Sequence, residues 1–496
     1  MEGDSKDSKT LAYDTAVVLE RSGHVHSSKD AEVKDPDIEF GGSEERRKLE
    51  RKLLWKLDCR MSIMIIIYIL NYIDRNNAAA ARLRGFEDDL HLEGQEFNTL
   101  LSILYVGYII MQIPSNILLN FIGRPSLYIP SCMIIWGTIS ILTGICQDFV
   151  GALITRFFLG FVEAAFFPGA IYLLSKWYTR TELGLRVCLL YCGNIISNAF
   201  GSLIASGILD GMQGKLGKAA WRWLFFIEGS LTIVVAITAI FILPDFPTNT
   251  RWLSPIEQKL AIRRMEEDSG SDEEDGTAAS TQLSGLWQAI SDWKVWWLAI
   301  ALSSEVVALS FNAFFPTLTK TLGFNTTITL ILVAPPWFTA AIAAFIVARH
   351  SDKIGERFYH ITGPFVVGIV GYIIAMSTMN LAARYVSLFL MTLTFSGYVQ
   401  IMTWVSNSIP RPPAKRAVAV AFVSCFSQLG NIAGSYIFPT NWGPTYKKSY
   451  AICIATQVTA IVMFWVFRKH LQRLNAKLEE EERERGQETR GFRYIL

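Results

Sequence analysis

Charged residues are scarce in this chain. Aspartate, glutamate, lysine and arginine make up 18% of its 496 residues, whereas about 25% is usual in soluble domains. Hydrophobic residues reach 51%, and they gather in repeated apolar runs of about 20 residues, the length that crosses a bilayer. This composition excludes a soluble globular protein. It predicts an integral membrane protein whose main partner is the lipid bilayer.

The sequence also lacks the motifs of enzyme chemistry. It has no glycine-rich loop ending in Lys-Ser or Lys-Thr, which excludes an ATP-driven pump, and no nucleophile elbow. Its seven cysteines have no metal-ligand spacing, and their odd number argues against a disulfide framework. The basic residues form no single patch, so no nucleic-acid partner is expected. We therefore predict a protein that is not an enzyme and that holds no metal and no cofactor.

The amino-terminal region is polar and has no apolar segment of the kind found in signal peptides. A cleavable signal peptide is therefore not expected, and the first spanning helix must serve as the signal. Residues 1–45 cannot bury a core and are predicted to be disordered. A basic cluster then precedes the first apolar run, which predicts a cytoplasmic amino terminus. The cluster consists of Arg46, Arg47, Lys48, Arg51, Lys52, Lys56 and Arg60.

The apolar runs predict twelve membrane-spanning helices. An even number places both termini on one side, and lysine and arginine in alternate loops place that side in the cytoplasm. The expected spans are 59–82, 97–121, 127–146, 149–178, 184–209, 221–243, 296–320, 325–349, 357–379, 384–408, 415–438 and 448–468.

A long polar segment divides these spans into six and six, a layout typical of two-bundle transporters. We therefore predict an all-α membrane protein with two six-helix bundles and both termini in the cytoplasm. The expected regions are a tail over 1–58, a first bundle over 59–243, a central loop over 244–295, a second bundle over 296–469 and a tail over 470–496. Within the central loop, residues 251–268 are expected to form a surface helix.

One cytoplasmic loop carries a recognisable pattern. The segment 351–357 reads Ser-Asp-Lys-Ile-Gly-Glu-Arg and resembles the loop signature of the major facilitator superfamily. The resemblance implies that Arg349, Asp352 and Arg357 act in gating and structure, because such residues lock neighbouring helices in that family. The matching loop of the first half is reduced to Gly123-Arg124 and has lost its acidic residue.

Four ionisable residues stand inside predicted spans. Asp74 and Arg75 lie in the first span, and Arg156 and Glu163 in the fourth. Each costs at least about 2.5–3.5 kcal/mol to insert, so a functional site is the default interpretation. Counting 1.5 Å per residue places the two pairs at compatible depths. A structural ion-pair network remains the alternative.

The four groups suit proton-coupled transport of an anion. A buried carboxylate can take a proton on one side of the membrane and release it on the other. An arginine stays charged and offers a planar fork to a substrate carboxylate. Protonating Asp74 or Glu163 would free a neighbouring arginine for the anion, which would link the two binding events.

A closer resemblance rests on three segments. They read Asn-Tyr-x-Asp-Arg-x-Asn over 71–77, Arg-Phe-x-Leu-Gly-x-x-Glu over 156–163, and Trp-Arg-Trp-Leu-Phe-x-x-Glu-Gly over 221–229. They resemble the anion:cation symporter family, and more narrowly its fungal allantoate permease branch. The resemblance implies that Asp74 and Glu163 handle protons. It also implies that Tyr72 and Arg75 contact substrate and that Arg156 tunes the glutamate. Arg156 is counted among the substrate-binding candidates as well.

Other polar residues in the spans are weaker candidates. Asn194, Thr403, Trp404, Ser424 and Gln428 are expected to line a substrate cavity, with hydrogen bonding between helices as the alternative for each. Glu305 has no evident role. Glu228 is expected to be structural and to pair with Arg222 or another local base. Asn325 begins the one glycosylation sequon in a predicted outside loop.

The sequence and the resemblance together predict a monomeric fungal secondary transporter of the plasma membrane, with the proton as its coupling ion. The arginines indicate only that the substrate is an anion, and the resemblance implies a small organic one such as nicotinate, allantoate or another vitamin or nitrogen-source carboxylate. The alternatives are an exporter or exchanger of an acidic secondary metabolite and, third, a nutrient sensor built on a transporter scaffold.

Overall fold

A computed structural model describes residues 37–269, 285–409, 413–485 and 493–496. These residues form helices and turns and include no strand, so the predicted all-α architecture is confirmed for them. Most of the segment predicted to be disordered lies outside the described residues. Residues 37–52 form a compact unit of their own. They hold the turn Ile38–Phe40 and the beginning of α2 (Ser43–Met61), and the Arg46 guanidinium bonds to Asp37 at 2.6 Å.

Ten helices in the described ranges are long and apolar enough to cross a membrane. Two further helices do not meet this criterion. Polar residues interrupt α3, and α19 begins with polar residues. The prediction of twelve spans counts these two and stays a prediction. The first set of helices is α3 (Ile63–Ala81), η2 (Arg82–Arg84), α4 (Phe86–Asp89), α5 (Glu96–Ile122), α6 (Pro125–Thr143), α7 (Phe149–Glu163), α8 (Phe166–Trp177), α9 (Arg180–Gly211) and α10 (Ala220–Ile242).

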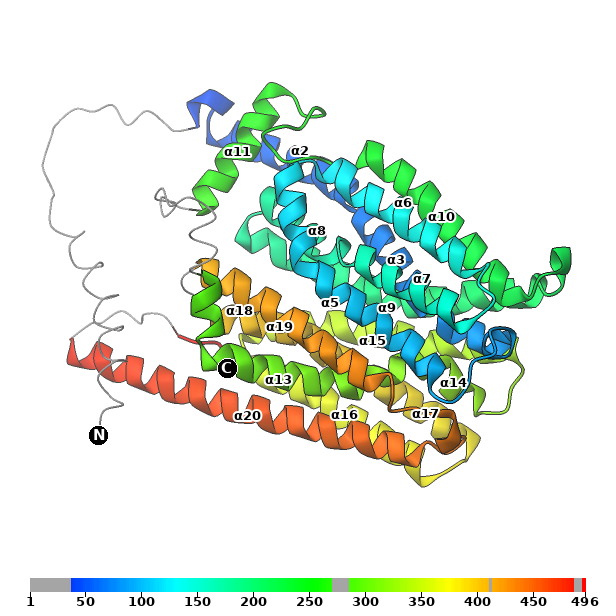
Figure 1. Ribbon diagram of the computed structural model, residues 1–496. Coiled ribbons are helices and arrows are strands. Elements are labelled where there is room, and N and C mark those ends of the chain that lie inside the picture. The colour runs from blue at the N-terminus through cyan, green and yellow to red at the C-terminus, as the bar shows by residue number, and fades with distance from the viewer. Residues whose placement is uncertain (1–36, 270–284, 410–412, 486–492) are drawn as a thin grey trace, which may run out of the picture. The chain divides into compact units, whose positions relative to one another are not determined.

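The second set follows the central loop and repeats the plan of the first (Figure 1). In each set the opening helix runs through a 3-10 turn into a short helix, and one later span is broken in its middle, between α7 and α8 or between α17 and α18. The second set is α13 (Trp293–Ala308), η4 (Leu309–Phe314), α14 (Phe315–Lys320), α15 (Thr326–Ile354), α16 (Phe358–Ser377), α17 (Leu381–Thr392), α18 (Thr394–Ser408), α19 (Pro413–Gly434) and α20 (Lys447–Glu484).

The packing within the sets repeats as well. In the first set α10 lies against α3 and α6, and in the second set α20 lies against α13 and α16. Across the sets, α9 packs on α15 and α5 packs on α19. Each opening helix therefore contacts the last helix of its own set, and α9–α15 and α5–α19 are the main contacts between the sets.

The two sets are joined by hydrogen bonds at one end. Among the residues described, every such bond lies at the end that holds η2 and α14, on the right of Figure 1. This end is therefore closed in the structure. The bonds join Arg82 to Thr440, Thr99 and Ser102 to Tyr436, Ser206 to the Thr327 carbonyl, and Thr327 to Asp210.

The central loop forms the surface helix that the sequence predicts, α11 (Pro255–Ser269). Its carboxylate Glu257 accepts from the Lys56 ammonium at 2.6 Å. Its guanidinium Arg264 donates to both oxygens of Glu182 on α9. The helix is thus tied by charge to the first set, at the end of the molecule away from η2.

Candidate functional site

Arg75 and Glu163 form an ion pair between α3 and α7. The Arg75 Nη2 and Nε atoms lie 2.9 and 3.0 Å from Glu163 Oε2. Both residues are buried, and Glu163 Oε1 has no hydrogen-bond partner among the described residues. The structure therefore brings these two predicted residues together. A pair this well removed from water is strongly coupled, because there is little solvent to screen it.

Asp74 lies beside this pair but does not bond to an arginine. Its Oδ1 accepts from Ser140 Oγ on α6 at 3.2 Å, and its Oδ2 accepts from Thr232 Oγ1 on α10 at 2.8 Å. The expectation that either carboxylate masks an arginine therefore needs correction, since only Glu163 does so directly. The reason is helix geometry, because adjacent residues of a helix point about 100° apart.

Arg156 lies next to this ion pair and contacts the main chain of Arg75. Its Nη1 donates to the main-chain carbonyl of Arg75 at 3.1 Å, and its guanidinium lies 5.6 Å from the centre of the Phe225 ring. Its Nε and Nη2 atoms have no hydrogen-bond partner in the part of the chain that the structure describes. Arg156 is fully buried and is not among the residues that line the nearby cavity. It is thus placed to influence Arg75 and Glu163, not to contact a ligand in this conformation.

A small cavity of about 30 Å³ opens beside Arg75. Both helix sets contribute to its wall, and it has room for about two water molecules. Among the predicted substrate residues, Tyr72, Arg75, Asn194, Ser424 and Gln428 line it. The full lining is Tyr68, Asn71, Tyr72, Arg75, Tyr108, Phe167, Tyr191, Asn194, Tyr398, Ser424 and Gln428.

Thr403 and Trp404 lie away from this cavity. The Trp404 ring is fully buried against Phe464 and Phe467, and its indole N–H donates to the Ile495 carbonyl at 2.9 Å. The Thr403 side chain is exposed. The contribution of α18 to the cavity comes instead from Tyr398, less than two turns earlier.

Tyrosine rings surround the Arg75 guanidinium. Its central carbon lies 4.9 Å from the ring centres of Tyr72 and Tyr108 and 5.8 Å from that of Tyr105. Sequence reasoning identified only Tyr72. The position of Tyr105 and Tyr108 could have identified them. Tyrosines of membrane proteins gather at the ends of spans, whereas these two lie in the middle of α5.

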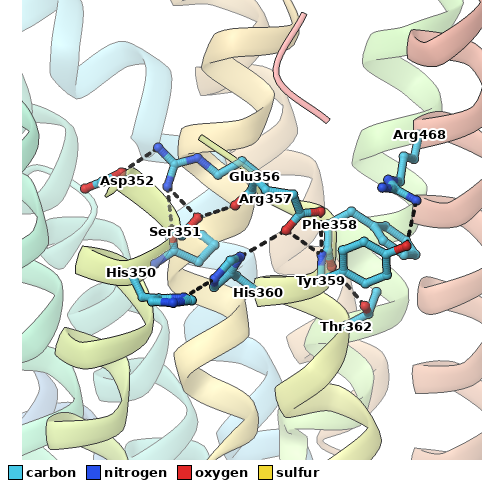
Figure 2. Close-up of polar contacts among 11 residues, drawn as sticks. His350, Ser351, Asp352, Glu356, Arg357, Phe358, Tyr359, His360, Thr362 and Arg468 are labelled. Carbon is cyan, nitrogen blue, oxygen red and sulfur yellow. Dashed lines mark hydrogen bonds and ion pairs between the residues drawn. The ribbon is translucent and has the colours of Figure 1, made fainter. Parts of the chain in front are cut away.

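The loop between α15 and α16 holds a network of polar contacts (Figure 2). Arg357 bonds to Asp352 at 2.6 Å and donates to Ser351 Oγ and Gln400 Oε1, both at 2.9 Å. Gln400 belongs to α18, so the buried Arg357 connects three helices. Arg349 is exposed, and the structure gives no ion pair for it within the described ranges. The implied gating role of these residues stays a prediction.

The corresponding loop of the first set obtains its carboxylate from elsewhere. Asp245, which follows α10, accepts from the Ser126 N–H at the start of α6 at 3.2 Å. Asn249 donates to the Gly123 carbonyl at 2.9 Å. The acidic residue that the sequence lacks between α5 and α6 is thus replaced by one distant in sequence.

Glu228 does not form the pair expected for it. Arg222 instead donates to the carbonyls of Gly144 and Cys146 at 3.1 and 2.7 Å. Glu228 is buried, and neither of its oxygens has a hydrogen-bond partner among the residues described.

Asn325 serves as the N-cap of α15. Its Oδ1 accepts from the Ile328 N–H at 2.8 Å. The residue is exposed, and its glycosylation stays a prediction.

Comparison with known proteins identifies the family. Residues 64–435 match the model of the Major Facilitator Superfamily. The chain is 30% identical over 475 residues to the MFS-type transporter cnsO of Penicillium expansum, with 90% of each protein covered. It is 30% identical over 467 residues to the Uncharacterized transporter C1683.12 of Schizosaccharomyces pombe, covering 91% of this chain and 94% of that protein.

A solved structure shares the fold. It is the crystal structure of a bacterial homolog to the human lysosomal transporter Spinster, in an inward-facing and occupied conformation. The two structures agree with a TM-score of 0.62 at 16% identity, over 82% of this chain and 96% of that one. The likeness concerns the fold alone. From the family match and the two relatives, this chain is a multi-pass integral membrane protein that belongs to the Major Facilitator Superfamily of transporters.

Proposed function

We propose that this protein is a secondary active transporter that couples proton entry to the uptake of a small organic anion. In this proposal it belongs to the fungal allantoate permease branch of the anion:cation symporters and works as a monomer in the plasma membrane. It has twelve spans in two bundles, and both termini are cytoplasmic. The observation that carries the proposal is the buried Arg75–Glu163 ion pair beside a cavity to which both helix sets contribute.

The ion pair gives a physical route for coupling. While Glu163 is ionised it neutralises Arg75, so the guanidinium has little attraction left for an anion. A proton on Glu163 removes that countercharge, and a substrate carboxylate can take its place on the planar fork of the arginine. Release of the proton to the other side restores the pair and expels the anion. Asp74, bonded to two hydroxyls, is the second proton-handling carboxylate.

The surroundings of Arg75 favour a compact carboxylate. Tyr72, Tyr105 and Tyr108 offer ring faces near the guanidinium, and the amide of Asn194 and the hydroxyl of Ser424 offer hydrogen bonds. A nicotinate-like or allantoate-like carboxylate, or another vitamin or nitrogen-source acid, fits this chemistry. The cavity of about 30 Å³ is far smaller than the roughly 300 Å³ of the smallest usual ligand pockets. Binding therefore requires the two sets to move apart, as they do in alternating access.

Uptake in a permease-deficient yeast tests the proposal. Labelled nicotinate, allantoate, biotin and pantothenate are offered at about pH 5 and about pH 7, with and without a protonophore. We expect one of these acids to accumulate at the lower pH and the protonophore to abolish the accumulation. Uptake of none of them, or uptake indifferent to the protonophore, would overturn the proposal. Faster loss of preloaded label would favour the exporter instead.

A further inference from the structure

Glu305 is a buried acid in the second helix set that the proposed mechanism does not use. It lies on α13 and is completely buried. Its Oε1 has one weak partner, the Gln457 amide on α20 at 3.5 Å, and its Oε2 has none among the residues described. An ionised carboxylate in such a position is costly, because it has lost water without gaining donors.

The position of Glu305 repeats that of Asp74. Asp74 is the twelfth residue of α3 and Glu305 is the thirteenth of α13, the opening helices of the two sets. Asp74 bonds to Thr232 on α10, the last helix of the first set. Glu305 contacts Gln457 on α20, the last helix of the second set. Each acid thus lies in the second half of its opening helix and contacts the last helix of its own set.

A third helix also lies near each acid, α6 in the first set and α16 in the second. Asp74 accepts from Ser140 on α6, which packs against α10. In the second set α16 packs against α20, and a methyl group added to Gly368 of α16 would lie 3.5 Å from the Gln457 amide nitrogen. The difference between the sites is their donors. Asp74 receives two hydroxyl hydrogen bonds, whereas Glu305 has only the distant amide.

Among the described residues, no positive charge acts on Glu305 to hold it ionised. The lysine of α19, Lys415, pairs with Asp292 at the start of α13, more than three turns before Glu305. The 3-10 turn η4 has no titratable residue. The titratable side chains near Glu305 are Tyr372 on α16, Tyr398 on α18 and Cys453 on α20. Tyr398 also lines the cavity beside Arg75.

We propose that Glu305 is a further proton-binding carboxyl, placed in the second helix set as Asp74 is placed in the first, and that it gains and loses a proton during the transport cycle. In the conformation seen here it holds the proton, as a neutral acid beside Gln457. When the second set opens this face to water, the proton passes to a water molecule and the carboxylate is left ionised. The inference rests on the proposed function only for the identity of the proton as coupling ion.

Infrared spectroscopy of the purified full-length protein in lipid nanodiscs tests this without any substrate. Spectra are recorded from about pH 5 to about pH 9 for the wild type and for Glu305→Gln. We expect the wild type to show a protonated-carboxyl C=O band that Glu305→Gln lacks, and the band to fade as the pH rises. A wild-type-minus-variant difference that does not change with pH would overturn the proposal, because a purely structural acid stays neutral. The absence of such a band would overturn it equally.

Two further variants keep the test decisive. Gln457→Leu removes the hydrogen-bond partner that Glu305 has among the described residues and is expected to shift the frequency of the same band. It therefore identifies Glu305 even if Glu305→Gln fails to fold. Glu182→Gln, at a carboxylate already paired with Arg264, is expected to leave the band unchanged. A band that Gln457→Leu does not move belongs to another acid and contradicts the proposal. Failure of the yeast uptake experiment leaves this spectroscopic result unaffected, so the two hypotheses fail separately.

Discussion

The Arg75 guanidinium contacts Glu163 Oε2 at 2.9 Å while the same side chain lines the cavity between the two helix sets. Glu163 itself does not line the cavity. The proposed anion would meet the arginine there and would compete with the glutamate for it. In the proposed function, the charge state of Glu163 therefore controls anion binding.

Glu163→Gln is expected to uncouple transport from the proton gradient. The amide keeps the size of the side chain but cannot carry the charge that masks Arg75. We expect uphill accumulation at acidic pH to fall by at least about tenfold, within the usual range of coupling between two ligands. Exchange of internal for external substrate should persist. Accumulation ratios and exchange rates in the same vesicles check this, and a wild-type accumulation ratio would contradict it.

Arg75→Lys is expected to weaken substrate binding although the charge is kept. Lysine lacks the planar fork, and each hydrogen bond lost to a charged group is worth about 1.5–3 kcal/mol. We therefore expect KM to rise by roughly tenfold or more, with a smaller change in the maximal rate. Arg222→Lys is the matched control, because that guanidinium binds the Gly144 and Cys146 carbonyls outside the cavity. Equal KM values for the two variants would argue against a substrate contact at Arg75.

The sequence identified those site residues whose insertion into a membrane costs a large free energy. Asp74, Arg75, Arg156 and Glu163 were found because ions are rare in spans, and the rise per residue of a helix then gave their depth. The sequence did not show how each helix is rotated about its own axis. It decides that Asp74 meets Ser140 and Thr232, whereas Arg75 next to it meets Glu163.

The remaining differences come from helix packing and from long-range contacts. Tyr398 and Trp404 are six residues apart on α18 and so lie on different faces of it, and the packing of α18 places Tyr398 and not Trp404 at the cavity. Asp245 substitutes for a missing loop carboxylate from more than a hundred residues away in sequence. Neither effect leaves a local signal, because both depend on how separate spans pack. The order of the spans and their helical nature do leave a local signal, which is the length and hydropathy of each apolar run.

The Asp292–Lys415 pair is expected to make stability depend on pH. Burial alone would raise the pKa of Asp292, but the Lys415 ammonium and the Lys294 N–H outweigh it and hold the pKa below its usual value. A lowered pKa means that the carboxylate stabilises the fold above its unfolded-state pKa of about 3.9 and loses that effect as the pH falls further. We expect the difference in unfolding temperature between wild type and Asp292→Asn to shrink below about pH 4.

Asp292→Ala separates the two roles of this residue. Asp292 also caps α13 by accepting from the Lys294 N–H at 3.0 Å, a role that asparagine retains and alanine does not. Losing a cap costs about 1 kcal/mol, so alanine should destabilise the protein beyond asparagine at neutral pH. Thermal unfolding in detergent measures both variants. A pH-independent difference between wild type and Asp292→Asn would show that the charge contributes nothing.

Tyr436→Phe is expected to favour opening at the end of the molecule that is closed here. The Tyr436 hydroxyl lies 3.1 Å from both Thr99 and Ser102 of the other helix set. Removing these bonds costs the closed form about 1 kcal/mol, roughly a fivefold shift in the equilibrium. Spin labels at the exposed positions Glu93 and Asn441 should report a larger population of long distances. Tyr359→Phe, which loses only a bond to Arg468 at the opposite end, should leave these distances unchanged.

Gly160→Ala is expected to destabilise the junction of α5 and α7 and to disturb the ion pair next to it. A methyl group at Gly160 would lie 1.9 Å from the Leu104 carbonyl oxygen, so the two helices must separate. Such overpacking costs about 1–3 kcal/mol. Because Gly160 precedes Glu163 by less than one turn of α7, the shift also moves the glutamate relative to Arg75. Both the unfolding temperature and the proton dependence of uptake should therefore fall.

Gly184→Ala provides the matched control for the substitution at the junction of α5 and α7. Gly184 lies within α9, and a methyl group there meets nothing within 4 Å. Replacing a helical glycine at an open position stabilises by about 0.4–1 kcal/mol, chiefly by restricting the unfolded chain. The two alanine variants should thus shift thermal unfolding in opposite directions. If Gly160→Ala were as stable as Gly184→Ala and kept wild-type proton dependence, the close approach of α5 and α7 would not be what holds Glu163 against Arg75.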